Sequence, residues 1–304
     1  MTHNGGSRAA AGRLSAAVLG TGLIGIDLMA KILRSDRLDL GLVAGRDEAA
    51  PGLRRTAALG VPVSARGVEA LVEAEHPFDV VFDATSAAAH AQHVEKLLPL
   101  GTTLIDLTPS RNGRMIIPTV NRADIAAHRD LSMVSCGGQA SVPILHAITQ
   151  AHRIDYIEVV TTCATRSIGR GTRMNLDEYV ETTQEAIRCF TGVRDVKVML
   201  NISPARPPAA FRVAMSLLGP DLTTSSVSAL VAGAAEEVRS YAGGFQVNAC
   251  TVNDGKAFVS VEVTSSGDRI PRYAGNLDII NSAAILVAEN YAAERLSTAG
   301  VGKS

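Results

Sequence analysis

The sequence predicts an α/β protein that combines a Rossmann-type, doubly wound parallel sheet with a second, α+β domain whose sheet is mixed or antiparallel. Short apolar strands alternate with helices up to about residue 135, a pattern that is typical of a parallel sheet. A glycine-rich segment, Gly20 to Gly25, joins the first strand to the first helix. After Ile154 the strands become longer and richer in β-branched residues, which indicates a different kind of domain.

Length and charge bound the class of protein. The 304 residues exceed one average core, so one large or two moderate domains are expected. Lys plus Arg number 29 and Asp plus Glu number 30, a balance that favours neither nucleic acid nor an anionic membrane as a partner. No segment has the apolar length of a transmembrane helix or of a signal peptide, and we expect a cytoplasmic location.

The predicted domain layout has four segments. Residues 1–14 are polar and glycine-rich and form a disordered leader, 15–135 form the dinucleotide-binding domain and 136–280 the catalytic domain, and 281–304 form a helix that returns to the first domain. The four cysteines show no C-x-x-C spacing, so neither a zinc site nor a disulfide framework is predicted.

The first strand, Ala16 to Gly20, leads into "GTGLIG" and then into a helix with apolar residues at helical spacing. Strand, G-x-G-x-x-G and helix in this order form the dinucleotide fingerprint. Gly20 permits the tight turn, Gly22 lets a pyrophosphate approach the backbone, and Gly25 lets the helix pack close to the strand. We therefore predict a nucleotide site at the start of this helix.

The second strand, residues 38–47, carries two candidate groups for the adenosine ribose. Asp47 can accept a hydrogen bond from a ribose 2′-hydroxyl, whereas Arg46 beside it can pair with a 2′-phosphate. We predict NAD as the cofactor and keep NADP as the alternative. Two solvated charges in a loop are the non-functional interpretation.

The alternation continues with strands in the segments 78–83, 102–110 and 131–136. The block "DATSAAAH", Asp83 to His90, follows a strand at the edge where such folds bind ligands, so Thr85 and Ser86 are predicted to face the cofactor. His90 and His93 lie three residues apart on the following helix. With no third ligand evident in the sequence, we predict surface or helix-packing histidines and no metal site.

The segment "SMVSCGGQASVPIL", residues 132–145, places Cys136 between a short strand and a helix. A helix N-terminus favours the thiolate, which is the nucleophilic form of cysteine. Gly137 and Gly138 permit a sharp turn and the close approach of another molecule. A small buried cysteine in a glycine turn is the alternative interpretation. Cys163, Cys189 and Cys250 lack glycine neighbours and are predicted to be core thiols.

The second domain is predicted from four strand-like segments and two amphipathic helices. The strands fall at 154–169, 196–205, 211–219 and 257–266, and the helices at 175–190 and 225–242. Asn175 is the expected N-cap of the first helix, with Asp177 and Glu178 in its first turn. A last helix, "SAAILVAENYAAERL", is apolar along one stripe.

Five blocks in this order resemble the acylating acetaldehyde dehydrogenases, over nearly the whole chain from Ala16 to about Ala293. They are "FDATSAAAH", "LIDLTPS", "VSCGGQASVP", "RSIGRGTRMNLDEYVETT" and "YAGNLDIINSAA". The resemblance implies a cytoplasmic enzyme that converts an aldehyde, NAD and coenzyme A into acyl-CoA, with Cys136 as the acyl-thioester nucleophile. It implies a catalytic domain that also forms a homodimer, and a TIM-barrel 4-hydroxy-2-oxoacid aldolase as a partner that supplies the aldehyde.

The resemblance also implies the residues that contact NAD. Besides the fingerprint glycines these are Thr21, Leu23, Ile24, Ser167, Gly169, Gly171, Thr172, Asn175 and Asn276. The segment Gly169 to Gly171, followed by Thr172, offers backbone N–H groups to a carboxamide or a phosphate, although a plain connecting loop is the simpler interpretation.

Three departures from the family pattern bear on the chemistry. An aspartate that the family places near the thiol corresponds to Val213, in "PPAAFRVAMSL". The segment between Gln246 and Phe258 is much shorter than in the family, and Arg206 replaces an acid in "SPARPP". Loss of a base commonly costs two to four orders of magnitude in rate.

Three alternatives to aldehyde oxidation therefore stay open. The first is a reductase of a non-standard acyl thioester, carried by a protein, in a biosynthetic pathway. The second is a weakly catalytic NAD-binding subunit that stabilises an aldolase. The third is a Rossmann reductase without covalent catalysis, which leaves the "SCGGQ" segment unexplained.

Overall fold

A computed structural model of the chain describes residues 12–169, 173, 175–267 and 269–301. Contacts divide these residues into two units, each with its own sheet. The first unit takes in 12–116, 121–133 and 284–301, and the second 117–120 and 134–283. None of the described helices combines the length and the apolar character needed to cross a membrane.

The first unit contains a seven-stranded sheet in which every paired neighbour runs parallel. Its order is β3-β2-β1-β4-β5-β7-β6. The strands are β1 (Leu14–Leu19), β2 (Leu38–Ala44), β3 (Val63–Ser64), β4 (Val80–Asp83), β5 (Thr103–Asp106), β6 (Arg114–Met115) and β7 (Asp130–Ser132). The predicted doubly wound parallel sheet is confirmed. The strand order reverses between β1 and β4, which is where such sheets bind ligands.

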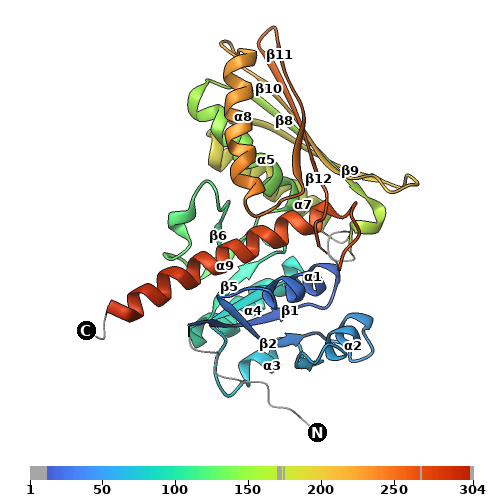
Figure 1. The fold of residues 1–304 in the computed structure, drawn as a ribbon, viewed down its shortest axis with the longest axis vertical. Coiled ribbons are helices and arrows are strands. Elements are labelled where there is room, and N and C mark those ends of the chain that lie inside the picture. The colour runs from blue at the N-terminus through green and yellow to red at the C-terminus, as the bar shows by residue number, and fades with distance from the viewer. Residues whose placement is uncertain (1–11, 170–172, 174, 268, 302–304) are drawn as a thin grey trace. The chain divides into compact units, whose positions relative to one another are not determined.

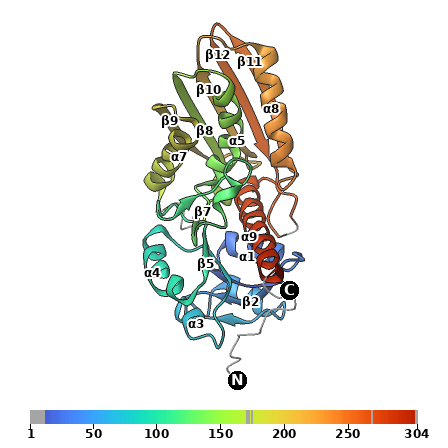
Figure 2. The same cartoon turned by 90° about the vertical axis from the view of Figure 1, so that its left-hand side faces the viewer.

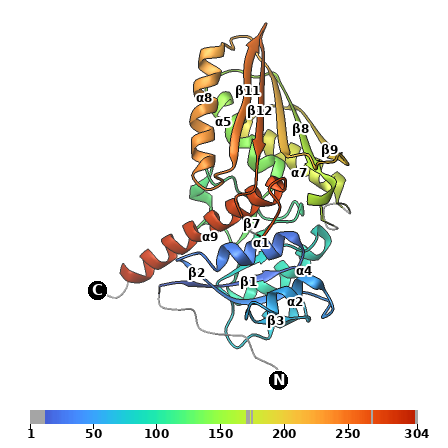
Figure 3. The ribbon, with the colours of Figure 1, turned by 45° about the vertical axis from the view of Figure 1, so that its right-hand side comes forward.

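Helices cover both faces of this sheet. They are α1 (Leu23–Ile32), α2 (Pro51–Ala57), α3 (Glu69–Val72), α4 (Ala87–Leu97) and the later part of α9 (Gly275–Val301), with short 3-10 turns at Leu98–Leu100 and Arg122–Asp124. Leu71 of α3 and Leu97 of α4 pack with Leu19 and Leu42 in one apolar core. Figure 3 shows α1 on the opposite face of the strands. The last helix begins at Gly275 rather than near residue 282.

The second unit contains a five-stranded sheet in the order β11-β12-β10-β8-β9. The strands are β8 (Tyr156–Ala164), β9 (Asp195–Ser203), β10 (Phe211–Leu218), β11 (Phe245–Asn253) and β12 (Lys256–Val263). Strands β8 and β9 are parallel and the other pairs are antiparallel. The sheet is therefore mixed, which is one of the two forms that the sequence predicts. The sequence analysis did not predict β11. Its signal is the Asp254-Gly255 pair, which takes positive φ angles and closes a hairpin to β12.

Three helices pack together on one face of this sheet. The central helix, α5 (Cys136–Ala151), contacts both α7 (Leu176–Thr191) and α8 (Thr224–Arg239) as well as β10. Figures 1 and 2 show these helices beside the strands of the second unit. A 3-10 turn at Thr165–Ser167 ends β8. Along β10, Val213 and Met215 are buried toward the helices, whereas Arg212 and Leu218 are exposed on the other face.

Candidate active site

The glycine fingerprint forms the β1–α1 turn that the sequence predicts. Gly20 has φ +108°, and a β-carbon there would collide with the carbonyl of Ala84. At Gly25 a β-carbon would collide with the Gly20 carbonyl, so the helix packs directly on the turn. Gly22 is the N-cap of α1 and faces open space, with no atom within 4 Å of a β-carbon built there. An incoming group can therefore approach the backbone at Gly22 and the first N–H groups of α1.

A cavity of about 390 Å³ lies beside this turn, wholly within the first unit. It joins Gly20 and Thr21 to Thr85 from the β4 end, and to Arg46 and Asp47 from the β2 end. Leu23 and Ile24 do not line it; Leu23 is exposed on α1. Glycine backbone at one end and an adjacent acid and base at the other fit the phosphates and the ribose of a dinucleotide.

The two ribose candidates differ in how they are engaged. Asp47 Oδ1 accepts a hydrogen bond from the Ala49 N–H at 2.9 Å, which closes a local turn. The side-chain stem of Arg46 lies 3.5 Å from the position of a β-carbon at Gly67, across the cavity mouth. Both side chains are exposed, so either can reach a ribose substituent.

His90 and His93 are buried in the first unit, so the prediction of surface residues is wrong and helix packing describes them better. His90 Nδ1 lies 2.9 Å from Asp83 Oδ2, and His93 Nδ1 lies 2.6 Å from the same oxygen. His90 Nε2 lies 3.1 Å from Asp130 Oδ1 and 3.6 Å from Asp106 Oδ2. We call Asp83, His90, His93, Asp106 and Asp130 the buried charge network.

Burial and charge act against each other in this network. Burial alone would lower the pKa of His90, but its hydrogen bonds to Asp130 and Asp83 and the charge of Asp106 raise that pKa to about 10. Burial would raise the pKa of Asp83, yet hydrogen bonds from His90, His93 and Thr85 hold it below its ordinary value. Burial, together with the charge of Asp83, raises the pKa of Asp106 to about 7 against the opposing charge of His90.

The network also brings together three groups that could ligate a cation, namely Asp83, His90 and Asp106, with one atom of each within 4.8 Å of the others. The sequence analysis found no third ligand because Asp106 comes from the neighbouring strand, β5. Both ring nitrogens of His90 face carboxylates at hydrogen-bond distance. In the structure, His90 is therefore a charged histidine that is hydrogen-bonded to carboxylates through both ring nitrogens.

In the second unit, Cys136 is the first residue of α5, as the sequence predicts for a thiol at a helix N-terminus. Ser135 is the N-cap, and its hydroxyl accepts a hydrogen bond from the Gly138 N–H at 2.9 Å. Val134 takes φ 62°, a left-handed conformation that is unusual for a β-branched residue. This strained turn leads into the first residue of the helix, Cys136, which is partly exposed.

The two glycines after Cys136 leave room for groups of the protein itself. A β-carbon at Gly137 would collide with Tyr179 Oη and with Thr161 Oγ1, and one at Gly138 would press on the Val134 and Ser135 side chains. The sequence analysis assigned this space to an incoming molecule. The structure fills it instead with Tyr179, from α7, and Thr161, from β8.

Polar groups without charge surround the sulfur of Cys136. A hydrogen bond from Cys163 contributes most to lowering the pKa of Cys136, and contacts with Tyr179 and the Gly137 N–H add to it against the opposing effect of burial. Tyr179 Oη lies 3.6 Å from Cys136 Sγ. The hydrogen bond to Cys136 and burial raise the pKa of Cys163, and burial raises that of Tyr179. Cys136 is therefore the group that ionises first.

Cys163 and Tyr179, the two side chains that contact Cys136, are not among the candidates that the sequence predicts. Cys163 is buried, as predicted for a core thiol, but it faces the nucleophile candidate. Its signal is strand alternation, because Thr161 and Cys163 are two apart on β8 and share one face. Cys189 is exposed and Cys250 is partly exposed, so the prediction of core thiols is wrong for Cys189 and incomplete for Cys250.

The remaining cofactor candidates lie in and after the 3-10 turn that ends β8, at the start of α7 and at the start of α9. The Asn276 side-chain amide donates to the Ser167 carbonyl at 3.0 Å, and Asn276 Oδ1 is buried without a hydrogen-bond partner in the described part of the chain. Asn175 is the N-cap residue of α7, as predicted, although its side chain makes no capping bond. Gly169 borders open space. Gly171 and Thr172 lie outside the described residues.

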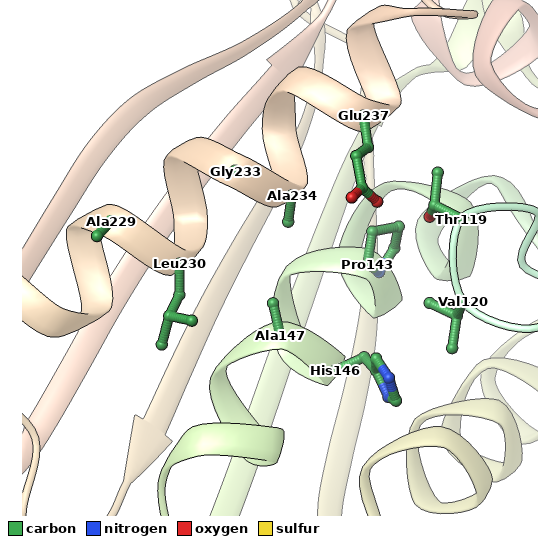
Figure 4. A pocket seen from close by; sticks show the side chains of 10 residues that line it. All are labelled: Thr119, Val120, Pro143, His146, Ala147, Ala229, Leu230, Gly233, Ala234 and Glu237. Carbon is green, nitrogen blue, oxygen red and sulfur yellow. The ribbon is translucent and has the colours of Figure 1, made fainter.

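A second cavity, of about 450 Å³, lies between α5 and α8 in the second unit (Figure 4). Its lining includes Pro143 and His146 from α5, Leu230 from α8, Thr119 and Glu237. Cys136 does not line this cavity, so it is separate from the thiol site. Arg206, at a position where the resemblance implies an acid, is exposed in the β9–β10 loop.

Comparisons with known proteins agree with the division of the chain into two units. A family model described as the semialdehyde dehydrogenase NAD-binding domain matches residues 15–128, and one described as the prokaryotic acetaldehyde dehydrogenase dimerisation domain matches 136–271. A solved aspartate semialdehyde dehydrogenase II of Vibrio cholerae aligns with a TM-score of 0.63, covering 94% of this chain and 99% of that one. At 17% identity it shows the shared fold.

Relatives of known name extend over nearly the whole chain. The acetaldehyde dehydrogenase of Streptomyces griseus is 52% identical over 287 residues, which are 94% of this chain and 93% of that protein. The Pectobacterium atrosepticum protein of the same name is 42% identical over 90% of this chain and 93% of its own length. That of Geobacillus stearothermophilus is 37% identical over 94% and 98%, respectively. The chain therefore belongs to the acetaldehyde dehydrogenase family, whose members are NAD-binding oxidoreductases.

Proposed function

We propose that the protein converts a short aldehyde to acyl-CoA, and the reverse, through a thioester on Cys136. The observation that carries this proposal is the placement of Cys136 in the first turn of α5, partly exposed and with a lowered thiol pKa. Helix N-termini and nearby donors favour thiolate, the form that attacks carbonyl carbon.

The residues of the chain account for each covalent step. The Cys136 thiolate attacks the aldehyde carbon and forms a carbon–sulfur bond, and the carbonyl oxygen takes up a proton. When bound, NAD would accept the hydride from the thiohemiacetal carbon while the hydroxyl group releases its proton to solvent, which leaves a thioester on Cys136. The thiolate of coenzyme A then attacks the thioester carbon, and Cys136 departs as thiolate, which its hydrogen-bonding neighbours stabilise as a leaving group.

The nucleotide is held by the first unit in this proposal. The Gly20–Gly25 turn and the first N–H groups of α1 take the pyrophosphate, and Asp47 takes the ribose hydroxyls. Arg46 beside Asp47 supports the acceptance of NADP as well. In the second unit, Asn276 Oδ1 has no hydrogen-bond partner among the described residues and offers an acceptor to the nicotinamide carboxamide.

Partners and location follow from the family. A homodimer is supported by the match of residues 136–271 to the dimerisation model and by exposed Leu218 on the sheet face opposite the helices. A TIM-barrel aldolase that passes on the aldehyde and a cytoplasmic location rest on the resemblance alone. The comparisons do not favour a carrier-bound thioester reductase or a weakly catalytic binding subunit.

Intact-mass analysis after incubation with acetyl-CoA tests the proposal. Wild type should gain one acetyl group, Cys136→Ser should gain none, and Cys189→Ser, which removes an exposed thiol, should behave as wild type. Equal acetylation of wild type and Cys136→Ser would overturn the assignment.

A further inference from the structure

We propose that Tyr179 is a positioning residue for Cys136. Its hydroxyl accepts a hydrogen bond from the Gly137 N–H and donates a hydrogen bond to the Cys136 sulfur. An uncharged donor would thus hold the thiolate, since none of the groups that contact Cys136 among the described residues is a carboxylate. The inference deepens the proposed function and rests on Cys136 being the nucleophile.

The direction of the hydrogen bonds follows from the two measured contacts. A tyrosine hydroxyl has one proton to donate and accepts through its oxygen. The Gly137 N–H donates to Tyr179 Oη at 3.1 Å, so the oxygen already acts as acceptor. Its own proton remains for Cys136 Sγ at 3.6 Å, a normal separation for a hydrogen bond to sulfur. Tyr179 is only 4% exposed, so water does not compete for that proton.

Thr161 supports the same hydroxyl from the opposite side. Its Oγ1 shares with Tyr179 Oη the space in which a β-carbon of Gly137 would lie. Thr161 is fully buried, and apart from its contact with Tyr179 its hydroxyl has no hydrogen-bond partner among the described residues. The Thr161 hydroxyl can therefore donate a hydrogen bond to the remaining lone pair of Tyr179 Oη. Hydrogen bonds in series strengthen one another in a low-dielectric interior.

The neighbouring strand explains why an uncharged donor is needed here. Val213 stands directly opposite Thr161 in the β8–β10 ladder and is fully buried on the same face. Where the family pattern has a carboxylate, this chain has an apolar side chain. Stabilisation of the thiolate thus falls to Tyr179, to Cys163 and to the N–H groups at the start of α5.

A purely structural role for Tyr179, as a filler between α5 and α7, predicts a different experimental outcome. Loss of packing would change the alkylation rate of Cys136 by the same factor at every pH. Loss of a hydrogen-bond donor would instead shift the pH at which Cys136 becomes reactive and leave the rate at high pH unchanged. The pH profile therefore separates the two roles.

The test compares wild type, Tyr179→Phe and Tyr241→Phe by iodoacetamide alkylation across a pH series, with the modified peptides quantified by mass spectrometry. Tyr241 is the matched control, since its hydroxyl is also buried in the second unit and has no hydrogen-bond partner among the described residues. Tyr179→Phe should raise the apparent pKa of Cys136 by about one unit, so alkylation below that pKa slows about tenfold. The rates should converge at high pH, and Tyr241→Phe should match wild type.

An unchanged apparent pKa in a folded Tyr179→Phe protein would overturn the inference. If that variant fails to fold in a thermal melt, Thr161→Val decides: a smaller shift in the same direction supports the inference, and no shift overturns it. Acetylation by acetyl-CoA is measured on the same samples. Failure of wild type to be acetylated at Cys136 refutes the proposed function, whatever the alkylation profiles show.

Discussion

Val213 and Thr161 oppose each other on the buried face of the second sheet, at the point where the sheet meets the start of α5. Directly opposed residues of an antiparallel pair place their β-carbons about 5 Å apart on one face. The side chain at position 213 is therefore a neighbour of Thr161, whose hydroxyl contacts that of Tyr179, the residue beside the Cys136 sulfur. An aspartate at this position, which the resemblance to the family implies, would stand beside these hydroxyls.

Restoring this carboxylate should accelerate aldehyde oxidation. We expect Val213→Asp to raise the rate by about tenfold or more near pH 7, because a general base contributes at least that much. Val261→Asp is the control, since Val261 is equally buried and faces Val213 from β12. It should lower the thermal midpoint without a gain in rate. A folded Val213→Asp enzyme with unchanged oxidation would show that another group already supplies the base.

Gly22→Val should abolish NAD binding and leave the thermal midpoint of the apoprotein near that of wild type. The backbone at Gly22 has φ −77°, which any residue adopts, and the space around it is open until a pyrophosphate arrives. Gly25→Ala is the contrasting variant, because its β-carbon meets the Gly20 carbonyl and should cost about 1–3 kcal/mol of stability. Calorimetric titration with NAD and thermal melts measure the two effects. Normal NAD binding by a folded Gly22→Val protein would contradict the assigned pyrophosphate position.

Cys163→Ala should raise the pKa of the Cys136 thiol, and Cys163→Ser should keep it closer to that of wild type. The alanine variant loses the donor that contributes most to lowering the Cys136 pKa, whereas serine retains one. A hydrogen bond worth about 1 kcal/mol corresponds to about a fivefold slower alkylation at neutral pH. Peptide-level alkylation rates check this. Identical alkylation rates of Cys136 in both variants and in wild type would show that Cys163 contributes only to packing.

The stability of the first unit should fall as the pH rises from about 7 toward 10. His90 has a pKa of about 10 in the folded protein against an ordinary value of 6.5, so its stabilising contribution is complete below 6.5 and is lost as the pH passes through 10. Asp106, with a pKa raised to about 7, adds a loss at lower pH because the unfolded chain releases its proton first.

Thermal midpoints measured between pH 6 and 10 test this dependence. His90→Gln should be less stable overall but show a flatter decline, since the titrating group is gone. His76→Gln, which changes an exposed histidine of the same unit, should keep the wild-type slope. A wild-type slope in His90→Gln would assign the pH dependence to other groups.

The sequence predicted the features that depend on short-range patterns. The glycine turn at Gly20 to Gly25 and the helix that begins at Cys136 are both encoded in consecutive residues, and both are confirmed. It did not predict the partner of Cys136, because Tyr179 lies 43 positions further along the chain and meets the sulfur only when α7 packs on α5. Asp106 joined His90 by the same kind of long-range contact, through strand pairing.

The buried charge network also constrains how this unit can evolve. His90 faces Asp83, Asp106 and Asp130, which belong to three different strands. A neutral residue in place of His90 leaves these acids facing one another, and breaking one buried pair costs about 3–5 kcal/mol, much of the stability of a typical domain. Each single substitution is therefore selected against, although a joint replacement by well-packed apolar residues is tolerable. In descendants of this chain the histidine and its acids should be inherited together or lost together.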